Sequence, residues 1–302
     1  MRSIEQIISA LSKQHYITDR PLATVLFLAQ ALKKPVFLEV EPGVGKTEVA
    51  LALSRILKTR LIRLQCYEGL DVHTALYEWN YPKQILSIRL AEAAGRASNN
   101  LEKLIFSEEF LIKRPLLEAI LSPEPRPPVL LIDELDRADE EFEAFLLEIL
   151  SDFQVSIPEI GTLKAKQRPW VIITSNRTRD IHDALKRRCL YHWIEYPSVE
   201  KEFQIILSRI PKIDHSLAGK IARFMAGLRG QDLQKKPGIS ESLDWAWALI
   251  HLHKPALDEQ TVEETLGCIL KYQEDQRFFR EKVLGDEGRR QAFFETDAGT
   301  PG

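Results

Sequence analysis

Short apolar runs alternate with stretches of helical periodicity over most of the chain. Each run is rich in Val, Ile or Leu and is bounded by turn residues, as buried strands are. The runs are Val36–Val40, Leu61–Leu64, Val129–Ile132, Trp170–Thr174 and, with a weaker pattern, Leu190–Ile194. From Thr47 onward apolar residues recur at helical spacing, and helical stretches separate most of the other runs. Strands that alternate with helices predict a parallel sheet covered on both faces.

The connection between the second and third predicted strands is far longer than a single crossover helix needs. It contains helical stretches near Ile85–Ala97 and Leu116–Leu121, and a proline-rich link, SPEPRPP. An insertion of this size usually serves a function beyond closing the sheet. Farther along, residues 153–165 alternate apolar and polar around the sequence PEIG, which predicts a β-hairpin.

Strand signals stop after Pro197 and give way to helical periodicity. The helical stretches are Phe203–Ile210, Leu217–Leu228, Leu243–Leu252 and Val262–Tyr272. We therefore expect a second, all-helical domain. The predicted boundaries are 1–35 for an N-terminal helical segment, 36–197 for an α/β core, 198–294 for the helical domain and 295–302 for a disordered tail.

Composition excludes several classes of protein. Hydrophobic residues make up 44% of the 302 residues, which is too many for a disordered chain. Lys and Arg number 41 against 44 Asp and Glu, so the basic footprint of a nucleic-acid-binding protein is absent. No apolar run approaches the roughly 20 residues of a membrane span, and the N-terminus has no signal-peptide pattern. Three cysteines without a C-x-x-C pair indicate neither a disulfide framework nor a zinc site. We expect a soluble cytoplasmic protein.

The segment VFLEVEPGVGKTEVA places a phosphate-binding pattern between a strand and a helix. Gly45-Lys46-Thr47 ends the pattern G-x-x-x-x-G-K-[ST], but Val40 occupies the position of its first glycine. Gly43 and Gly45 still allow the backbone to approach phosphates closely. Lys46 would neutralise phosphate charge and the Thr47 hydroxyl would bind Mg²⁺. The alternative is an ordinary strand, turn and helix with an accidental GKT.

A pair of acids supports the first interpretation. Asp133 and Glu134 follow a buried apolar run in PVLLIDELDRAD. An Asp at that place is expected to anchor Mg²⁺ through water, and the adjacent Glu can polarise an attacking water. In isolation, two acids after a strand are commonly just the start of a loop. Together with the GKT they predict an intact nucleotide site in which Val40 is a variation.

Two further segments fit the same chemistry. Asn176 ends the strand of RPWVIITSNRTRD, where a polar side chain can hold the attacking water or contact the γ-phosphate, although an Asn after a strand is often a turn residue. Lys186-Arg187-Arg188 precedes the last predicted strand. This triplet is either a solvated basic turn or an arginine finger that acts on a neighbouring subunit, which would require self-assembly.

These motifs, in this order, resemble the AAA+ ATPases, and more narrowly the MoxR family. The resemblance rests on EPGVGKTE, LLIDELDRADEEFEAFLLEILSDFQVSIPEIG and VIITSNRTRDIHDALKRRC. It covers Val36 to about Pro197 strongly and the helical lid weakly. The segment CYEGLDVHTALYEWNYPKQIL is similar to a subgroup that includes CoxD, a maturation factor for molybdenum-copper carbon monoxide dehydrogenase. The resemblance implies an α/β P-loop AAA+ core with a parallel five-stranded sheet, a helix 2 insert, a β-hairpin before sensor 1 and a C-terminal all-helical lid.

The resemblance also implies a role for each site residue, with ATP and Mg²⁺ as cofactors. The metal would be held by Thr47 and Asp133, and the catalytic residues would be Glu134, the sensor 1 residue Asn176 and the finger Arg188, with Arg187 as the alternative finger. The nucleotide-binding residues would be Glu41, Pro42, Gly43, Val44, Gly45, Lys46, Thr47 and Glu48. Ser242 stands where many relatives carry a sensor 2 arginine, so either Lys235 or Lys236 replaces that arginine or the residue is lacking.

The function implied by this resemblance is Mg²⁺-dependent ATP hydrolysis by a ring, expected to be a hexamer. The ring would remodel or mature a client metalloenzyme, for example by metal-cluster assembly in a molybdenum hydroxylase, together with a partner that carries a von Willebrand factor A (VWA) domain. Two alternatives stay open. One is an AAA+ nucleic-acid motor or clamp loader, which the near-neutral charge argues against. The other is a nucleotide-binding switch without hydrolysis, which Glu134 beside Asp133 argues against.

Overall fold

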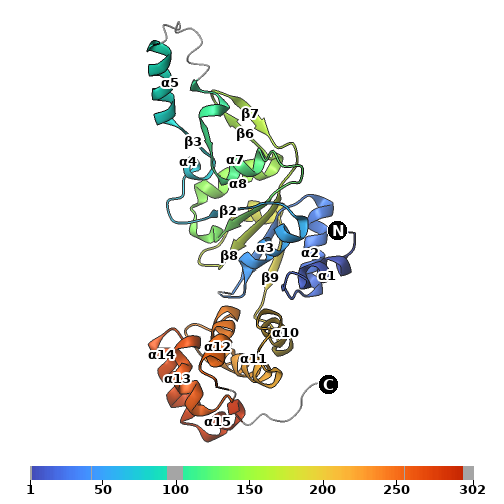
Figure 1. Ribbon diagram of the computed structural model, residues 1–302, viewed down its shortest axis with the longest axis vertical. Helices are drawn as coiled ribbons and strands as arrows, with labels where there is room; N and C mark the ends of the chain where they lie inside the picture. Colours follow the sequence, from blue (N-terminus) through green and yellow to red (C-terminus); the bar gives the residue numbers. More distant parts are fainter. Residues whose placement is uncertain (1, 42, 94–104, 255, 295–302) are drawn as a thin grey trace. The chain divides into compact units, whose positions relative to one another are not determined.

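The computed structural model describes residues 2–41, 43–93, 105–254 and 256–294 (Figure 1). Contacts between Cα atoms divide the chain into two compact units. The first, called here the α/β unit, comprises Met1–Gln14, Thr18–Val40 and Thr47–Trp193. The second, called here the helical unit, comprises His15–Ile17, Glu41–Lys46 and Ile194–Gly302. Pro42 and the predicted tail at 295–302 lie outside the described residues.

A five-stranded sheet forms the centre of the α/β unit. Its strands are β1 (Val36–Val40), β2 (Leu61–Gln65), β5 (Val129–Asp133), β8 (Trp170–Ser175) and β9 (Leu190–Ile194). They lie in the order β2-β5-β8-β1-β9, and the pairs β2–β5, β5–β8 and β8–β1 are parallel. The five apolar runs are thus the five strands, and the predicted parallel sheet is confirmed.

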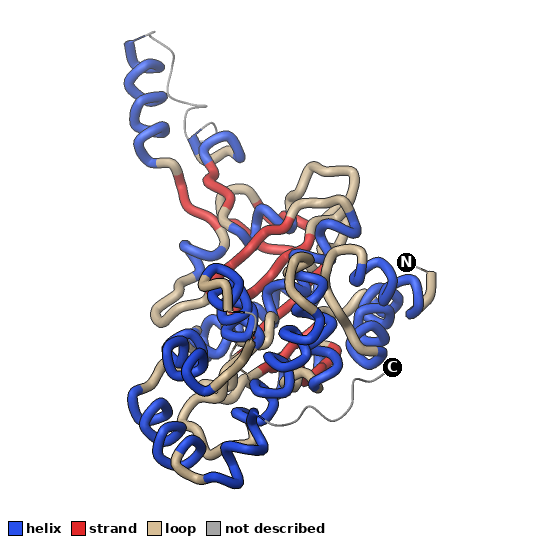
Figure 2. The backbone as a smooth tube through the Cα atoms, turned by 60° about the horizontal axis from the view of Figure 1, so that its bottom comes forward, coloured by secondary structure: helices blue, strands red, loops and turns tan. Residues whose placement is uncertain are grey.

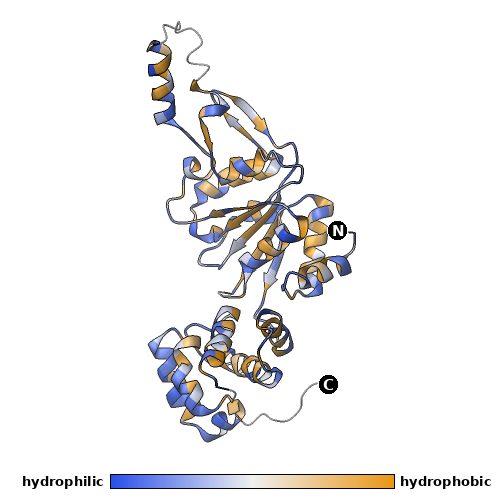
Figure 3. Ribbon diagram, viewed as in Figure 1, coloured by the Kyte–Doolittle hydropathy of each residue, from blue (hydrophilic) through white to orange (hydrophobic). Residues whose placement is uncertain are grey.

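Helices accompany this sheet, whose strands are mostly hydrophobic (Figure 3). Successive strand residues point to opposite faces. Phe37, Leu130 and Ile132 face one large cluster, while the alternate residues Val36 and Leu38 are buried elsewhere. The helices beside the sheet are α2 (Arg20–Leu32), α3 (Lys46–Leu57), α7 (Pro115–Ile120), α8 (Glu140–Asp152) and α9 (Asp183–Arg188). Helix α1 (Ile4–Ser12) packs against α2.

The long connection between β2 and β5 holds small elements of its own. They are α4 (Val72–Ala75), β3 (Tyr77–Trp79), α5 (Tyr81–Ala93), the 3₁₀ turn η2 (Glu108–Phe110) and β4 (Leu111–Lys113). The antiparallel ribbon β3–β4 was not predicted, because each strand is only three residues long. Helix α5 begins earlier than predicted, and residues 94–97 of that prediction lie outside the described residues. Figures 1 and 2 both show α5 projecting from the body of the α/β unit.

The predicted β-hairpin is present. Strands β6 (Gln154–Ile157) and β7 (Gly161–Lys164) pair antiparallel, with Ile157 opposite Gly161. Gly161 has φ 95°, a backbone conformation that an L side chain adopts only with strain, so the turn requires glycine there. A hydrogen bond of 3.0 Å between the Ser156 and Thr162 hydroxyls links the two strands.

The helical unit has its own core. Its elements are α10 (Val199–Arg209), α11 (His215–Arg229), α12 (Ile239–His251), α13 (Glu259–Ile269), α14 (Gln273–Phe278), the π-helical turn η4 (Phe279–Leu284) and α15 (Glu287–Phe294). The four predicted helices correspond to α10–α13, whereas α14 to α15 were not predicted. Phe224 packs against the rings of Trp245, Phe279 and Phe293 at the centre of this core. Among the described residues, no helix combines the length and apolar character needed to cross a membrane.

Candidate functional site

The register of the sheet gathers polar residues from three strands at one edge. Gln65 pairs with Asp133 across β2 and β5, and Ile132 pairs with Ile173 across β5 and β8. The carboxyl ends of these parallel strands therefore lie side by side, which is where open α/β sheets bind ligands. Asp133 is the last residue of β5, and Thr174 lies one residue from the end of β8.

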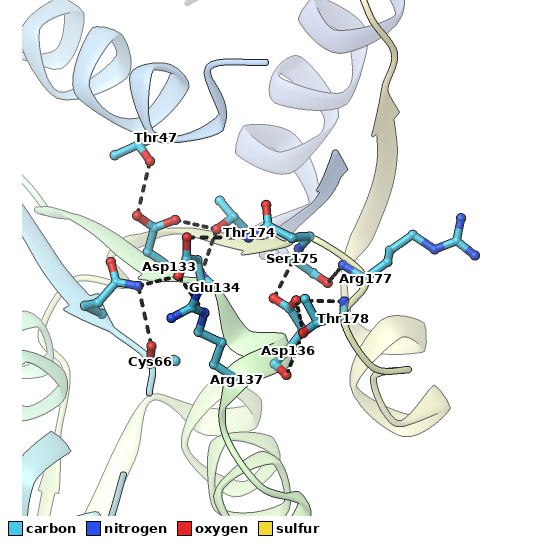
Figure 4. A network of polar contacts seen from close by, with 12 residues as sticks. Thr47, Cys66, Asp133, Glu134, Asp136, Arg137, Thr174, Ser175, Arg177 and Thr178 are labelled. Carbon is cyan, nitrogen blue, oxygen red and sulfur yellow. Dashed lines mark hydrogen bonds and ion pairs between the residues drawn. The ribbon is translucent and has the colours of Figure 1, made fainter. Parts of the chain in front are cut away.

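Asp133 lies at the centre of this site and contacts several of its side chains (Figure 4). Its carboxylate is only 1% exposed. The Thr47 hydroxyl donates to Oδ2 at 3.1 Å, and the Thr174 hydroxyl donates to Oδ1 at 2.5 Å. Arg63 donates to Oδ2 through both Nη2, at 2.6 Å, and Nε, at 3.1 Å. The structure thus brings the two predicted metal residues, Thr47 and Asp133, into direct contact.

Arg63 was not predicted as a site residue. It lies in β2, where its side chain is 51% exposed, and it pairs with a carboxylate that is almost completely buried. The sequence does carry a signal, since a lone arginine interrupts the apolar run LIRL. That signal gains meaning only once the parallel register places β2 beside β5.

Glu134 lies at the turn that follows Asp133. Its backbone is left-handed, with φ 56° and ψ 51°, and its N–H donates to the Thr174 hydroxyl at 3.0 Å. Gln65 Nε2 and Arg137 Nε each lie 3.1 Å from Glu134 Oε2. Asn176 Nδ2 donates to Oε1 at 3.4 Å. The structure therefore brings Asn176 and Glu134 together, and it adds Gln65 and Arg137, which the sequence interpretation missed.

Asp136 fixes the loop that carries Asn176. It accepts hydrogen bonds from the Asn176 N–H at 3.1 Å, the Thr178 N–H at 2.9 Å and the Thr178 hydroxyl at 2.6 Å. Burial alone would raise the pKa of Asp136, but the hydrogen bonds from Thr178 and Asn176 outweigh it and hold the pKa below its usual value. The charged carboxylate is therefore the form that the fold stabilises.

The glycine-rich loop has the backbone that a phosphate cradle needs. Gly43 and Gly45 have φ 83° and 90°, conformations that favour glycine, and α3 begins directly afterwards at Lys46. Val40 is the last residue of β1 and is 1% exposed, so its side chain belongs to the core. Glycine is not required at that position, because the chain is still extended there.

Two features of these residues fit ATP and Mg²⁺. Backbone N–H groups at the start of a helix after such a loop bind phosphate oxygens. The Thr47 hydroxyl uses its hydrogen toward Asp133, which leaves its oxygen lone pairs for a metal. The described residues contain no cluster of three His, Cys, Asp or Glu suited to a metal ion. A nucleotide-bound Mg²⁺ needs no such cluster, since phosphate oxygens and waters supply most of its ligands.

The basic triplet before β9 makes contacts of a different kind. Lys186 Nζ lies 3.2 Å from Glu39 Oε1, and Arg188 Nη1 donates to the Leu147 carbonyl at 3.1 Å. The Arg187 side chain is exposed and has no hydrogen bond or ion pair within the described part of the chain. No hydrogen bond or ion pair between described residues joins the triplet to Asp133 or Glu134.

Ser242 is completely buried within the helical unit. Its hydroxyl lies 2.5 Å from Glu202 Oε1 and 3.1 Å from the Gly238 carbonyl oxygen, both within donating distance of its single hydrogen. Glu202 is in turn paired with Arg229, whose Nη2 lies 2.8 Å from Oε1. Ser242 thus belongs to a buried cluster of hydrogen-bonded side chains that also contains Glu202 and Arg229. Lys235 and Lys236, the alternative sensor 2 residues, are both exposed.

The buried thiols have little nucleophilic character. Burial raises the pKa of Cys66 to about 12, and the charges of Asp133, Asp136 and Glu134 act in the same direction. Burial likewise raises the pKa of Cys189 to about 12. Both thiols stay protonated at neutral pH, so neither supplies the thiolate that cysteine chemistry needs.

Strand order, glycine loop and acid pair together define a P-loop nucleotide-binding domain. Residues 35–189 match the family model of the AAA domain, dynein-related subfamily. This match spans more than half of the chain, so the chain belongs to the AAA domain family, in its dynein-related subfamily.

The remaining comparisons concern the fold alone. No curated protein matches the chain significantly. Among solved structures, a point mutant of Thermotoga maritima RuvB is 16% identical, with a TM-score of 0.49, and the match covers 95% of this chain and 78% of that one. A protein from Cytophaga hutchinsonii that was provisionally named an ATPase is 14% identical, with a TM-score of 0.47. The match covers 96% of this chain and 92% of that one. Similarity this low supports no statement about activity. The narrower MoxR and CoxD resemblance is not confirmed.

Proposed function

We propose that this AAA domain hydrolyses ATP with Mg²⁺ at the edge of the sheet where β2, β5 and β8 end. The observation that carries the proposal is the pair of contacts at this edge. Thr47 touches Asp133 at 3.1 Å, and Asn176 touches Glu134 at 3.4 Å. The residue types that hold a nucleotide-bound metal and those that position a water are thus adjacent, as phosphoryl transfer requires.

In this proposal the loop and the start of α3 bind the phosphates. Gly43 and Gly45 let backbone N–H groups point inward, and Lys46 neutralises charge on the β- and γ-phosphates. Thr47 would ligate Mg²⁺ directly and Asp133 would hold its water ligands. When bound, Mg²⁺ would supply positive charge that neutralises the charge developing on the phosphate oxygens.

Glu134 is the proposed general base and Asn176 the residue that orients the water. Glu134 Oε2 accepts from both Gln65 and Arg137. A water that approaches Oε2 therefore has to displace one of these donors, which makes Gln65 and Arg137 positioning residues for the base.

We further propose that the protein assembles into a ring, with six subunits expected, in which a basic residue of α9 acts on the neighbouring site. Arg188 is the first candidate and Arg187 the second. Both side chains are exposed, as a residue that reaches a neighbour has to be, and the Arg187 side chain has no competing hydrogen bond or ion pair among the described residues. Sizing with and without nucleotide would test the assembly.

Remodelling of a client metalloenzyme, with a VWA-domain partner, rests on the sequence resemblance alone. Affinity capture with Glu134→Gln in the presence of ATP would test it, since this variant is expected to hold nucleotide and any bound client. Recovery of a VWA-domain protein or of a molybdenum hydroxylase subunit would support this part of the proposal. Recovery of neither, from cells shown to contain both, would remove it.

The central experiment compares two variants at the same site. Lys46→Ala should lose ATP binding in calorimetry, because the loop loses its positive charge toward the phosphates. Glu134→Gln should still bind ATP but release phosphate at least about a hundredfold more slowly, since the general base is lost. Unchanged affinity in the first variant, or unchanged turnover in the second, would contradict the assignment. Stimulation of turnover by duplex DNA would favour a nucleic-acid motor instead.

A further inference from the structure

A pocket of about 480 Å³ lies at the opposite edge of the sheet from Asp133. Its walls come from the end of α2, the residues just before β5, the segment between α8 and β6, and the loop between β7 and β8. Strands β1, β5 and β8 begin at this edge, whereas Asp133 is the last residue of β5. The pocket belongs to the α/β unit and shares no residue with the proposed nucleotide site.

Of the described residues, four cations line this pocket and no acidic residue does. They are Lys33, Lys34, Lys166 and Arg168. All four are exposed, and none of their side chains forms a hydrogen bond or an ion pair within the described residues. Like charges gathered on one concave surface repel one another and raise the local concentration of anions.

The local backbone does not balance this charge. Helices α2 and α8 both end beside the pocket, at Leu32 and Asp152. Each helix C-terminus contributes the equivalent of about half a negative charge. The Asp152 carboxylate, which precedes the pocket residue Phe153, adds one further negative charge. The negative charge beside the pocket is then about two, so about two of the positive charges remain without a counterpart. The positive charge that lines the pocket therefore exceeds the negative charge that the two helix ends and Asp152 supply.

The rest of the lining is apolar and partly aromatic. Phe153 is 3% exposed and lies under the Arg168 guanidinium, 5.4 Å from ring centroid to Cζ, while Trp170 is partly exposed. A concave site of a few hundred cubic ångströms with an apolar floor and a few charged groups is typical of small-molecule binding. A flat basic surface for a nucleic-acid duplex would lack such a floor.

We propose that this pocket binds a small phosphorylated molecule with a planar or apolar body. The phosphate would lie among Lys33, Lys34, Lys166 and Arg168, because lysine and arginine form strong charge-assisted hydrogen bonds to phosphate oxygens. The body would lie against Trp170 and Phe153. Such a ligand would bind independently of nucleotide at the loop before α3, and the proposal does not depend on ATP hydrolysis.

The experiment uses the full chain carrying Lys46→Ala, which removes binding at the glycine-rich loop. The probes are 1-naphthyl phosphate, inorganic phosphate and 1-naphthol, each titrated by calorimetry and by tryptophan fluorescence. In this background Lys166→Ala/Arg168→Ala removes one wall of cations and Lys33→Ala/Lys34→Ala removes the other. The matched control is Lys13→Ala/Arg55→Ala, which removes two exposed cations of the same unit outside the pocket. Thermal unfolding shows whether each variant is folded.

The expected result is binding of 1-naphthyl phosphate at least about tenfold tighter than either inorganic phosphate or 1-naphthol, with a loss of about tenfold in each pocket variant. The control variant should bind like its parent, and Trp170→Phe should remove the fluorescence change. Equal binding by the pocket variants and their parent would overturn the proposal. So would equal affinity for inorganic phosphate and 1-naphthyl phosphate. Binding of a DNA duplex that the pocket variants abolish, without binding of 1-naphthyl phosphate, would also overturn it.

Discussion

Replacing Arg63 by methionine should lower the Mg²⁺ concentration that the site needs. A carboxylate has about four lone-pair positions. In Asp133, Oδ2 receives two bonds from Arg63 and one from Thr47, whereas Oδ1 receives one from Thr174. The waters around a metal at Thr47 would need the same oxygen, Oδ2, that Arg63 occupies. Arg63 therefore competes with the hydrated metal for Asp133.

The size of this effect follows from the burial of the two partners. Asp133 is 1% exposed but the Arg63 side chain is 51% exposed, so solvent screens the pair in part. The interaction lies between an exposed ion pair, about 0.2–1 kcal/mol, and a hydrogen bond to a buried charge, about 1.5–3 kcal/mol. A value of about 1 kcal/mol corresponds to a change of about fivefold in apparent Mg²⁺ affinity.

The assay titrates Mg²⁺ into the full chain with a non-hydrolysable ATP analogue and follows calorimetric heat and the unfolding temperature. Arg60→Met is the matched control, because Arg60 is 56% exposed and pairs with Glu118 and Glu124 rather than with Asp133. Arg63→Met should reach half-saturation at about one fifth of the wild-type Mg²⁺ concentration, and Arg60→Met should not. An unchanged or higher Mg²⁺ requirement would refute the competition. Weaker analogue binding at saturating Mg²⁺ would show instead that Arg63 contacts the phosphates.

Three further predictions concern stability and assembly. Glu202→Ala should destabilise the helical unit by about 3–5 kcal/mol in chemical unfolding, because it leaves the buried Arg229 charge unpaired; a loss below about 1 kcal/mol would contradict this. The depressed pKa of Asp136 means that its contribution to stability is present above its unfolded pKa, about 3.9, and is lost as pH falls through the lower folded value. The difference in unfolding free energy between wild type and Asp136→Asn should therefore shrink below about pH 4, and a constant difference would be inconsistent with this linkage. Arg188→Ala mixed with Lys46→Ala should recover some ATP hydrolysis if Arg188 acts on the neighbouring subunit, whereas no recovery in confirmed mixed rings would move the assignment to Arg187.

The parts that could be predicted from the sequence are those with a local signal. The five strands appeared as apolar runs, and the hairpin appeared as alternation around PEIG, because burial and turn chemistry act over a few residues. The contact between Thr47 and Asp133 was also foreseeable, since a strand-loop-helix and a second strand ending in acids define it. Arg63 and Gln65 were not foreseeable in this way. Their roles depend on which strands are neighbours and on the register in which those strands pair. Neither can be read from a local pattern in the sequence.

The ribbon β3–β4 and the position of Ser242 show the same limit. A strand of three residues has too little alternation to be distinguished from a loop, and it forms here only because a partner lies beside it. The sequence resemblance put Ser242 at the position of the sensor 2 arginine, a residue expected to face nucleotide. Its burial against Glu202 depends on α10 and α11 packing around α12, which is a property of the tertiary structure.

The hydrogen bonds of the α/β unit join the proposed base and the proposed finger into one framework. Asp136, two residues after Glu134, holds both Asn176 and Thr178. Arg179 then donates to the Ala138 carbonyl and pairs with Glu143 of α8. Glu143 also accepts from the His182 N–H at 2.8 Å, where α9 begins. Because α9 carries Arg187 and Arg188, a displacement of the Glu134 loop would have to break these bonds or move α9 with it. The proposed base and the residues proposed to act on a neighbouring subunit are therefore linked through one continuous set of hydrogen bonds.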